Sequence, residues 1–212
     1  MKFNKYLFDF DGVLVDSMPY WSEKMINILK VTHTSYPEDI VKIITPLGDK
    51  GTATYFQDVL KVNMAMDEMF ALMDEYALPK YRDEILIKEG VFEFLRMLKE
   101  KHSSINILTA SPHKMVDPCL KRLGVYEWFD HIWTCEDFQL TKSDVRIFEK
   151  AADCLGCQAA DIMFFDDNIT ALRTAAKAGM YTVGVYDETS ADMAEQVKET
   201  AKQYIYSFRE MI

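Results

Sequence analysis

Short apolar runs alternate with longer amphipathic stretches through most of this chain. The runs are nearly continuous in apolar residues, and they lie at Lys5–Phe10, Ser104–Ala110, His131–Thr134, Ile162–Phe165 and Tyr181–Val185. Between the later runs, apolar residues recur with the i, i+3, i+4, i+7 spacing of a helix. Strands that alternate with helices predict right-handed βαβ units and a parallel sheet covered on both faces. The predicted fold class is therefore α/β, a doubly wound, Rossmann-like parallel sheet.

One stretch near the amino terminus breaks this rhythm. From about Ser17 to about Arg82 the sequence has no convincing strand and only helical patterns, with apolar stripes at Trp21, Met25, Ile28, Leu29 and at Met69, Phe70, Met73, Tyr76. We expect these aromatic and methionine side chains to form a core rather than to contact a ligand. The pattern predicts a helical cap at residues 17–85, inserted into an α/β core of residues 1–16 and 86–212.

Composition narrows the classes of partner. The chain has 212 residues, 49% of them hydrophobic, and a formal net charge of −10. The acidity argues against a nucleic-acid or membrane-surface binder, since both use a basic face, and no apolar stretch approaches the ~20 residues of a membrane span. Four cysteines are too few for a disulfide framework and predict a reducing, cytoplasmic setting. The oligomeric state stays open, and a monomer is compatible with the sequence.

Polar side chains follow four of the predicted strands. Ligands of an open parallel sheet bind beyond the carboxyl ends of its strands, and the candidates there are Asp9, Asp11, Thr109, Lys142, Asp166 and Asp167. Four carboxylates so close together cannot all stay ionised without a cation. An all-oxygen set suits Mg²⁺, whose coordination shell a substrate phosphate can complete. With a lysine and a hydroxyl beside a carboxylate nucleophile, the set predicts a site for phosphoryl transfer.

These motifs resemble those of the haloacid dehalogenase superfamily. Residues 9–17 read DFDGVLVDS, which is similar to the family's first motif, and Thr109, Lys142 and the pair Asp166-Asp167 follow in the order of its other three. The resemblance extends over essentially the whole chain. The helical insertion after the first motif resembles the small cap of the phosphoglycolate phosphatase and β-phosphoglucomutase-like subgroup.

The resemblance implies a role for each acid of the first motif. Asp9 is expected to attack phosphorus, forming an aspartyl-phosphate, and to bind Mg²⁺. Asp11 is expected to protonate the leaving oxygen and then to act as base for water, while its main-chain carbonyl binds the metal. Dehalogenases of the superfamily lack this second acid, so Asp11 favours phosphoryl transfer over dehalogenation.

The other motifs receive their roles in the same way. The resemblance implies that Thr109 and the amide of Ala110 hold phosphate oxygens and that Lys142 offsets the charge on Asp9. Asp167 aligns as the direct metal ligand, and Asp166 is expected to act directly or through water. The family's lysine is usually followed by a proline-rich pattern, which this chain replaces with Ser143-Asp144.

The predicted function is therefore Mg²⁺-dependent hydrolysis of a small phosphomonoester of the sugar phosphate, phosphoglycolate or nucleotide type. One alternative is a β-phosphoglucomutase-like sugar-phosphate mutase, although Tyr20-Trp21-Ser22 stand where the mutases have a histidine. A second is a catalytically weak phosphate-binding or regulatory homologue. A signalling receiver domain is a third, but in receivers the acid pair precedes the phospho-accepting aspartate along the chain.

Overall fold

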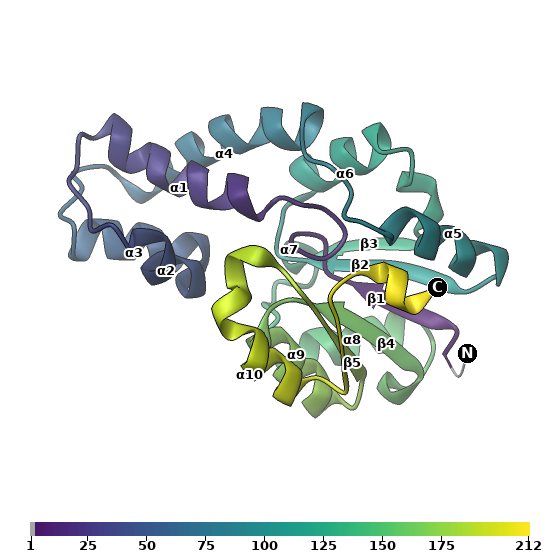
Figure 1. The fold of residues 1–212 in the computed structure, drawn as a ribbon. Coiled ribbons are helices and arrows are strands. Elements are labelled where there is room, and N and C mark those ends of the chain that lie inside the picture. The colour runs from purple at the N-terminus through teal and green to yellow at the C-terminus, as the bar shows by residue number, and fades with distance from the viewer. Residues whose placement is uncertain (1–2) are drawn as a thin grey trace. The chain divides into compact units, whose positions relative to one another are not determined.

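The computed structural model describes residues 3–212, and its centre is a six-stranded parallel sheet. The strand order is β3-β2-β1-β4-β5-β6 (Figure 1). The strands are β1 (Lys5–Phe8), β2 (Ser104–Thr109), β3 (His131–Thr134), β4 (Ile162–Asp166), β5 (Tyr181–Val185) and β6 (Gln203–Ile205). The predicted doubly wound α/β fold is confirmed. The short edge strand β6 was not predicted, because three residues with two polar members give no strand pattern.

The register places the carboxyl end of β1 between the ends of its two neighbours. Phe8 lies opposite Ile107 of β2 on one side and opposite Phe165 of β4 on the other. The amide of Asp9 extends the pairing, donating to the Phe165 carbonyl at 2.8 Å. The chain passes from β1 to β2 and β3 on one side and then to β4, β5 and β6 on the other. The carboxyl end of β1 is therefore the topological switch point, where α/β proteins bind ligands.

Helices cover both faces of the sheet. They are α5 (Val91–Glu100), α6 (His113–Arg122), α7 (Cys135–Phe138), α8 (Val145–Cys154), α9 (Ile169–Ala178) and α10 (Ala194–Thr200). Adjacent strand residues point to opposite faces. Leu7 and Phe164 accordingly join a buried cluster with residues of α8 and α9, whereas Phe8 and Phe165 stack with ring centroids 4.7 Å apart on the other face.

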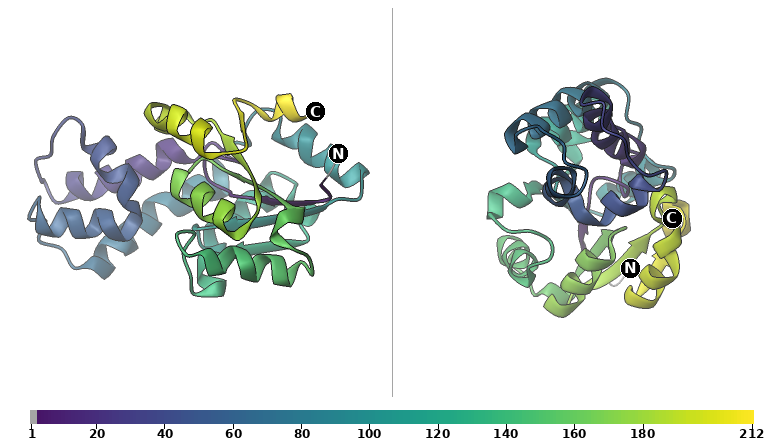
Figure 2. Two further views of the ribbon diagram at one scale, coloured as in Figure 1. Left: turned by 90° about the horizontal axis from the view of Figure 1, so that it is seen from below. Right: turned by 90° about the vertical axis from the view of Figure 1, so that its left-hand side faces the viewer.

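The C-terminal segment completes that second face. Phe208 packs against Phe94 of α5 and against Phe165, with ring centroids 5.4 and 5.5 Å apart. Figure 2 shows the yellow C-terminal turn beside the teal α5. Arg209 contacts the start of this helix so closely that a Cβ added at Gly90 would lie 2.6 Å from the Arg209 amide nitrogen.

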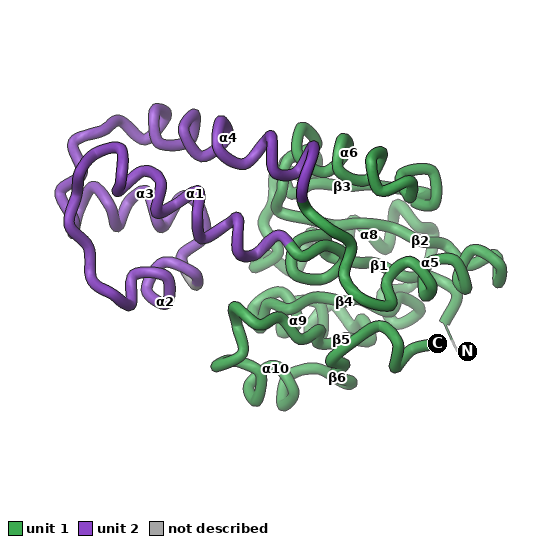
Figure 3. The backbone as a smooth tube through the Cα atoms, turned by 45° about the horizontal axis from the view of Figure 1, so that its top comes forward, with its two compact units in different colours: residues 1–16, 85–212 green, residues 17–84 purple. Residues whose placement is uncertain are grey.

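The chain divides into two compact units (Figure 3). The sheet unit runs up to Asp16 and resumes at Ile85, and residues Ser17–Glu84 form a helical unit. We had expected the second boundary one residue later, but Ile85 is fully buried and belongs to the sheet unit. The two connecting segments are hydrogen-bonded to each other, Asp16 N to Leu86 O and Lys88 N to Leu14 O, both at 2.9 Å.

The helical unit has a core of its own. Its helices are α1 (Met18–Val31), α2 (Ile40–Ile44), α3 (Gly48–Asp58) and α4 (Met66–Asp83). Both predicted stripes supply buried residues, among them Met25, Ile28, Leu29, Met69 and Met73. No helix within residues 3–212 combines the length and the apolar character needed to cross a membrane.

Candidate active site

A tight turn after β1 carries the two acids of the first motif. Asp9 is buried, and the chain reverses at Gly12, whose φ of 69° suits a residue without a side chain. The amides of Leu14 and Val15 both donate to the Phe10 carbonyl, and Gly12 N donates to Val15 O. The turn therefore has a defined backbone geometry rather than being an open loop.

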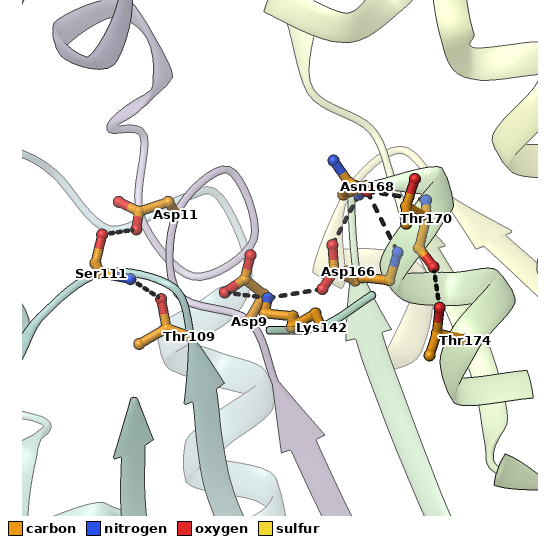
Figure 4. Close-up of polar contacts among 10 residues, drawn as sticks. Asp9, Asp11, Thr109, Ser111, Lys142, Asp166, Asn168, Thr170 and Thr174 are labelled. Atoms are coloured by element: carbon orange, nitrogen blue, oxygen red, sulfur yellow. Dashed lines mark hydrogen bonds and ion pairs between the residues drawn. The ribbon is translucent and has the colours of Figure 1, made fainter. Parts of the chain in front are cut away.

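A lysine lies between two of the predicted acids. Lys142 Nζ is 2.6 Å from Asp9 Oδ1 and 2.8 Å from Asp166 Oδ2 (Figure 4). Burial raises the pKa of Asp9; Lys142 lowers it, Asp166 and Asp11 raise it, and the result is about 7. For Lys142, burial opposes the charge, but the carboxylates of Asp166 and Asp9 outweigh it and raise its pKa. The lysine alone therefore does not keep Asp9 fully ionised at neutral pH.

The acid pair after β4 is held by the start of α9. Asp166 Oδ1 accepts from the amide of Asn168 at 2.8 Å, and Asn168 Oδ1 in turn accepts from the amide of Thr170 at 2.9 Å. Asp166 is fully buried and Asp167 is half-buried. Burial, followed by the charges of Asp166 and Asp9, raises the pKa of Asp167 well above its usual range.

The donor set fits a hard divalent cation. Asp9, Asp166 and Asp167 each offer a carboxylate oxygen, and these three oxygens lie within 4.8 Å of one another. Asp9 Oδ1 already contacts Lys142 Nζ at 2.6 Å, and the carboxylate is buried. The mutual repulsion of crowded carboxylates is relieved by a cation such as Mg²⁺. The side chain of Asp11, predicted to contribute a main-chain carbonyl, does not belong to this cluster.

The end of β2 adjoins the first motif. Thr109 is fully buried, and its Oγ1 accepts from the amide of Ser111 at 3.0 Å. Ser111 Oγ donates to Asp11 Oδ2 at 2.5 Å. Ala110, which lies between Thr109 and Ser111 in the sequence, is exposed. Ser111 was not among the predicted site residues, although its place directly after the second motif was a usable signal.

The departure in the lysine motif has a local explanation. The amide of Asp144 donates to the Thr141 carbonyl at 2.9 Å, which closes a turn around Lys142. Asp144 then begins α8, its Oδ1 accepting from the amide of Arg146 at 3.0 Å. The backbone of Asp144 thus closes the turn, and its side chain caps the helix that follows.

A second lysine, absent from the predicted set, lies at the same edge of the sheet. Lys88 Nζ donates to the carbonyls of Gly12 and Tyr186, at 2.7 and 2.8 Å, and to Asp187 Oδ2 at 3.0 Å. Lys88 therefore links two parts of the chain, the turn that contains Asp11 and the segment after β5. No motif in the sequence marks it.

The chain is similar to known proteins over most of its length. Residues 6–185 match the family described as haloacid dehalogenase-like hydrolase. The chain is 23% identical over 194 residues to validoxylamine A 7′-phosphate phosphatase of Streptomyces hygroscopicus subsp. limoneus, covering 91% of this chain and 89% of that protein. It is 21% identical to a phosphorylated carbohydrates phosphatase of Thermotoga maritima, covering 82% and 81%. A crystal structure from Haemophilus somnus, titled a "predicted phosphoglycolate phosphatase", superposes with a TM-score of 0.81 at 20% identity, covering 100% of this chain and 97% of that one.

Proposed function

Because the chain belongs to the haloacid dehalogenase-like hydrolases, we propose that it is a Mg²⁺-dependent phosphatase that hydrolyses a small phosphomonoester through Asp9. One observation carries the proposal: the buried carboxylate of Asp9 contacts Lys142 and lies together with Asp166 and Asp167 in a set of acids that fits a divalent cation. Lys142 balances the charge of ionised Asp9, and a bound cation would balance the charge of a phosphoryl group.

The metal ligands would be Asp9, Asp166 and Asp167, together with the main-chain carbonyl of Asp11. A bound Mg²⁺ supplies positive charge that favours ionised Asp9 and screens the phosphoryl oxygens. Lys142, 2.6 Å from Asp9 Oδ1, supplies further positive charge. Because these groups are in place before substrate arrives, little reorganisation is needed as charge develops.

The reaction proceeds in two steps on the residues of the chain. A carboxylate oxygen of Asp9 bonds to phosphorus while the ester P–O bond breaks, and Asp11 gives its proton to the leaving oxygen. Asp11, now ionised, takes a proton from water as the water oxygen attacks phosphorus. Phosphate leaves, and the Asp9 carboxylate is regenerated. The resemblance assigns phosphoryl oxygens to the Thr109 hydroxyl and the Ala110 amide, and both assignments belong to this proposal.

The relatives favour a small phosphorylated metabolite as substrate. Two of them are named for phosphatase activity on a validoxylamine phosphate and on phosphorylated carbohydrates. We further propose that the helical unit, Ser17–Glu84, is a cap whose residues select the substrate. Its place in the chain, inserted directly after the first motif, supports this role.

Release of inorganic phosphate from a panel of sugar phosphates, phosphoglycolate and nucleotides tests the proposal. Each compound is assayed with Mg²⁺ and with excess EDTA, with wild type beside Asp9→Asn. We expect release that requires Mg²⁺ and falls by several orders of magnitude in Asp9→Asn. Turnover by Asp9→Asn close to wild type would exclude the aspartyl-phosphate. No release from any compound by a folded protein would favour the mutase or the binding homologue.

A further inference from the structure

The carboxylate of Asp11 is contacted by a residue outside the four motifs. Ser111 Oγ donates to Asp11 Oδ2 at 2.5 Å, across 100 residues of sequence (Figure 4). We propose that Ser111 is a positioning residue that orients the Asp11 carboxylate for proton transfer to the leaving oxygen. This inference rests on the proposed function, in which Asp11 is the general acid.

Ser111 is itself anchored to a rigid part of the fold. Its amide donates to Oγ1 of Thr109, which is fully buried at the end of β2. Strand β2 pairs directly with β1. The hydroxyl of Ser111 therefore lies two residues beyond the end of β2, next to the strand that Asp9 follows.

The backbone beside Asp11 is fixed by a different contact. Lys88 Nζ donates to the Gly12 carbonyl at 2.7 Å, and the Gly12 amide donates to Val15 O at 3.1 Å. These bonds hold the main chain of the turn but do not set the rotation of the Asp11 side chain. The Ser111 hydrogen bond supplies that second restraint.

Orientation matters because proton transfer needs hydrogen-bond distance between the acid and the atom that receives the proton. Misplacement of a reacting group by about 1 Å costs roughly 100-fold in rate. Loss of the Ser111 hydroxyl removes a restraint on the carboxylate without removing the acid itself. Its effect is therefore confined to the steps in which Asp11 transfers a proton.

Comparison of two leaving groups isolates this effect. An alkyl phosphate has a basic leaving oxygen that needs a proton, whereas p-nitrophenyl phosphate releases a stable anion and needs little help. Values of kcat/KM report the step in which the ester bond breaks. For Ser111→Ala we expect a loss of roughly 10-fold or more with the alkyl phosphate and less than about 3-fold with p-nitrophenyl phosphate. Ser111→Thr, which keeps a hydroxyl, should recover most of the loss.

Two further variants serve as references. Ser104→Ala removes a hydroxyl at the opposite end of the same strand, where Ser104 Oγ accepts from Asn106, and should leave both activities unchanged. Asp11→Asn should show the same dependence on leaving group as Ser111→Ala, with a larger loss. Adding Ser111→Ala to Asp11→Asn should then cost nothing more, because a positioning residue acts only through the group it positions.

The outcomes separate this inference from the proposed function. An equal loss with both substrates, accompanied by weaker competitive inhibition by inorganic phosphate, makes Ser111 a phosphate ligand and overturns the positioning role. No loss with either substrate overturns it too. If wild type itself shows no Mg²⁺-dependent release, the proposed function fails, and the Ser111 inference fails with it. Circular dichroism of each variant verifies folding, and Ser111→Gly, which also lacks the hydroxyl, repeats the test should Ser111→Ala unfold.

Discussion

Buried Asp9 should make the metal-free protein less stable as the pH rises. Its folded-state pKa is raised to about 7 from an ordinary 3.8, first by burial and then by the neighbouring carboxylates, against the opposing effect of Lys142. Between these two values the folded chain holds a proton that the unfolded chain has already lost. Stability therefore falls as the pH rises through this window and levels off above about pH 7.

The size of the effect follows from the same rise in pKa. A change from 3.8 to about 7 corresponds to roughly 4 kcal/mol at most. The carboxylates titrate together, so we expect about 2–4 kcal/mol between wild type and Asp9→Asn. The asparagine variant should match wild type near pH 4 and should be the more stable protein near pH 8, in each case with EDTA.

Urea unfolding at the two pH values measures this difference. Mg²⁺ at pH 8 should stabilise wild type more than Asp9→Asn, because the cation binds the ionised carboxylate of the folded state. Asp144→Asn is a control at a half-buried aspartate, whose pKa is lowered to about 2 by its hydrogen bonds with Arg146. Its difference from wild type should not change from pH 5 to 8. A stability difference for Asp9→Asn that is equal at both pH values would refute the argument.

Three other substitutions test separate parts of the structure. Lys142→Met should lower kcat/KM for phosphate release by at least roughly 100-fold with folding intact. Unchanged activity would show that Lys142 has no role in the reaction. Lys88→Met removes the ion pair of the buried Asp187 carboxylate, which keeps its hydrogen bonds from Thr189, and should lower the unfolding free energy in urea by up to about 3 kcal/mol. The double variant Lys88→Met with Asp187→Asn should recover part of that loss, and a double variant as unstable as Lys88→Met would contradict the pairing. Gly90→Ala should lower stability by about 1–3 kcal/mol, since Gly90 has φ 79° and a Cβ would meet Arg209 N at 2.6 Å; an unchanged melting temperature would argue against this contact.

The sequence was most informative where chemistry follows directly from strand order. Parallel strands bring their carboxyl ends to one edge, so residues that follow β1 and β4 had to be neighbours once the sheet was predicted. This reasoning placed Asp9, Asp166 and Asp167 together without knowledge of any side-chain conformation. Lys142 required more, because it follows β3 by several residues and reaches Asp9 only through the turn that Asp144 closes.

Contacts that depend on a single side-chain direction were not predictable in this way. The Ser111–Asp11 bond needs a particular rotamer at each residue, which no pattern of apolar spacing encodes. Lys88 has carbonyl partners 76 and 98 residues away in the chain, and its own neighbours in sequence give no sign of them. Strand β6 was not predicted because its short, partly polar sequence has no strand pattern. It forms a strand through its pairing with β5.

The proposed role of Asp9 and its surroundings favour different protonation states of its carboxyl group. A nucleophilic carboxylate must be ionised, yet burial and the neighbouring acids raise the pKa of Asp9 to about 7. A second lysine in place of Asp167 would favour ionisation permanently, but it would also remove an oxygen that a cation could bind. On the proposed function, the acidic site instead makes ionisation of Asp9 depend on a bound cation. On the proposed function, nucleophile activation and metal binding are therefore one equilibrium, and the cost in stability without metal is its measurable consequence.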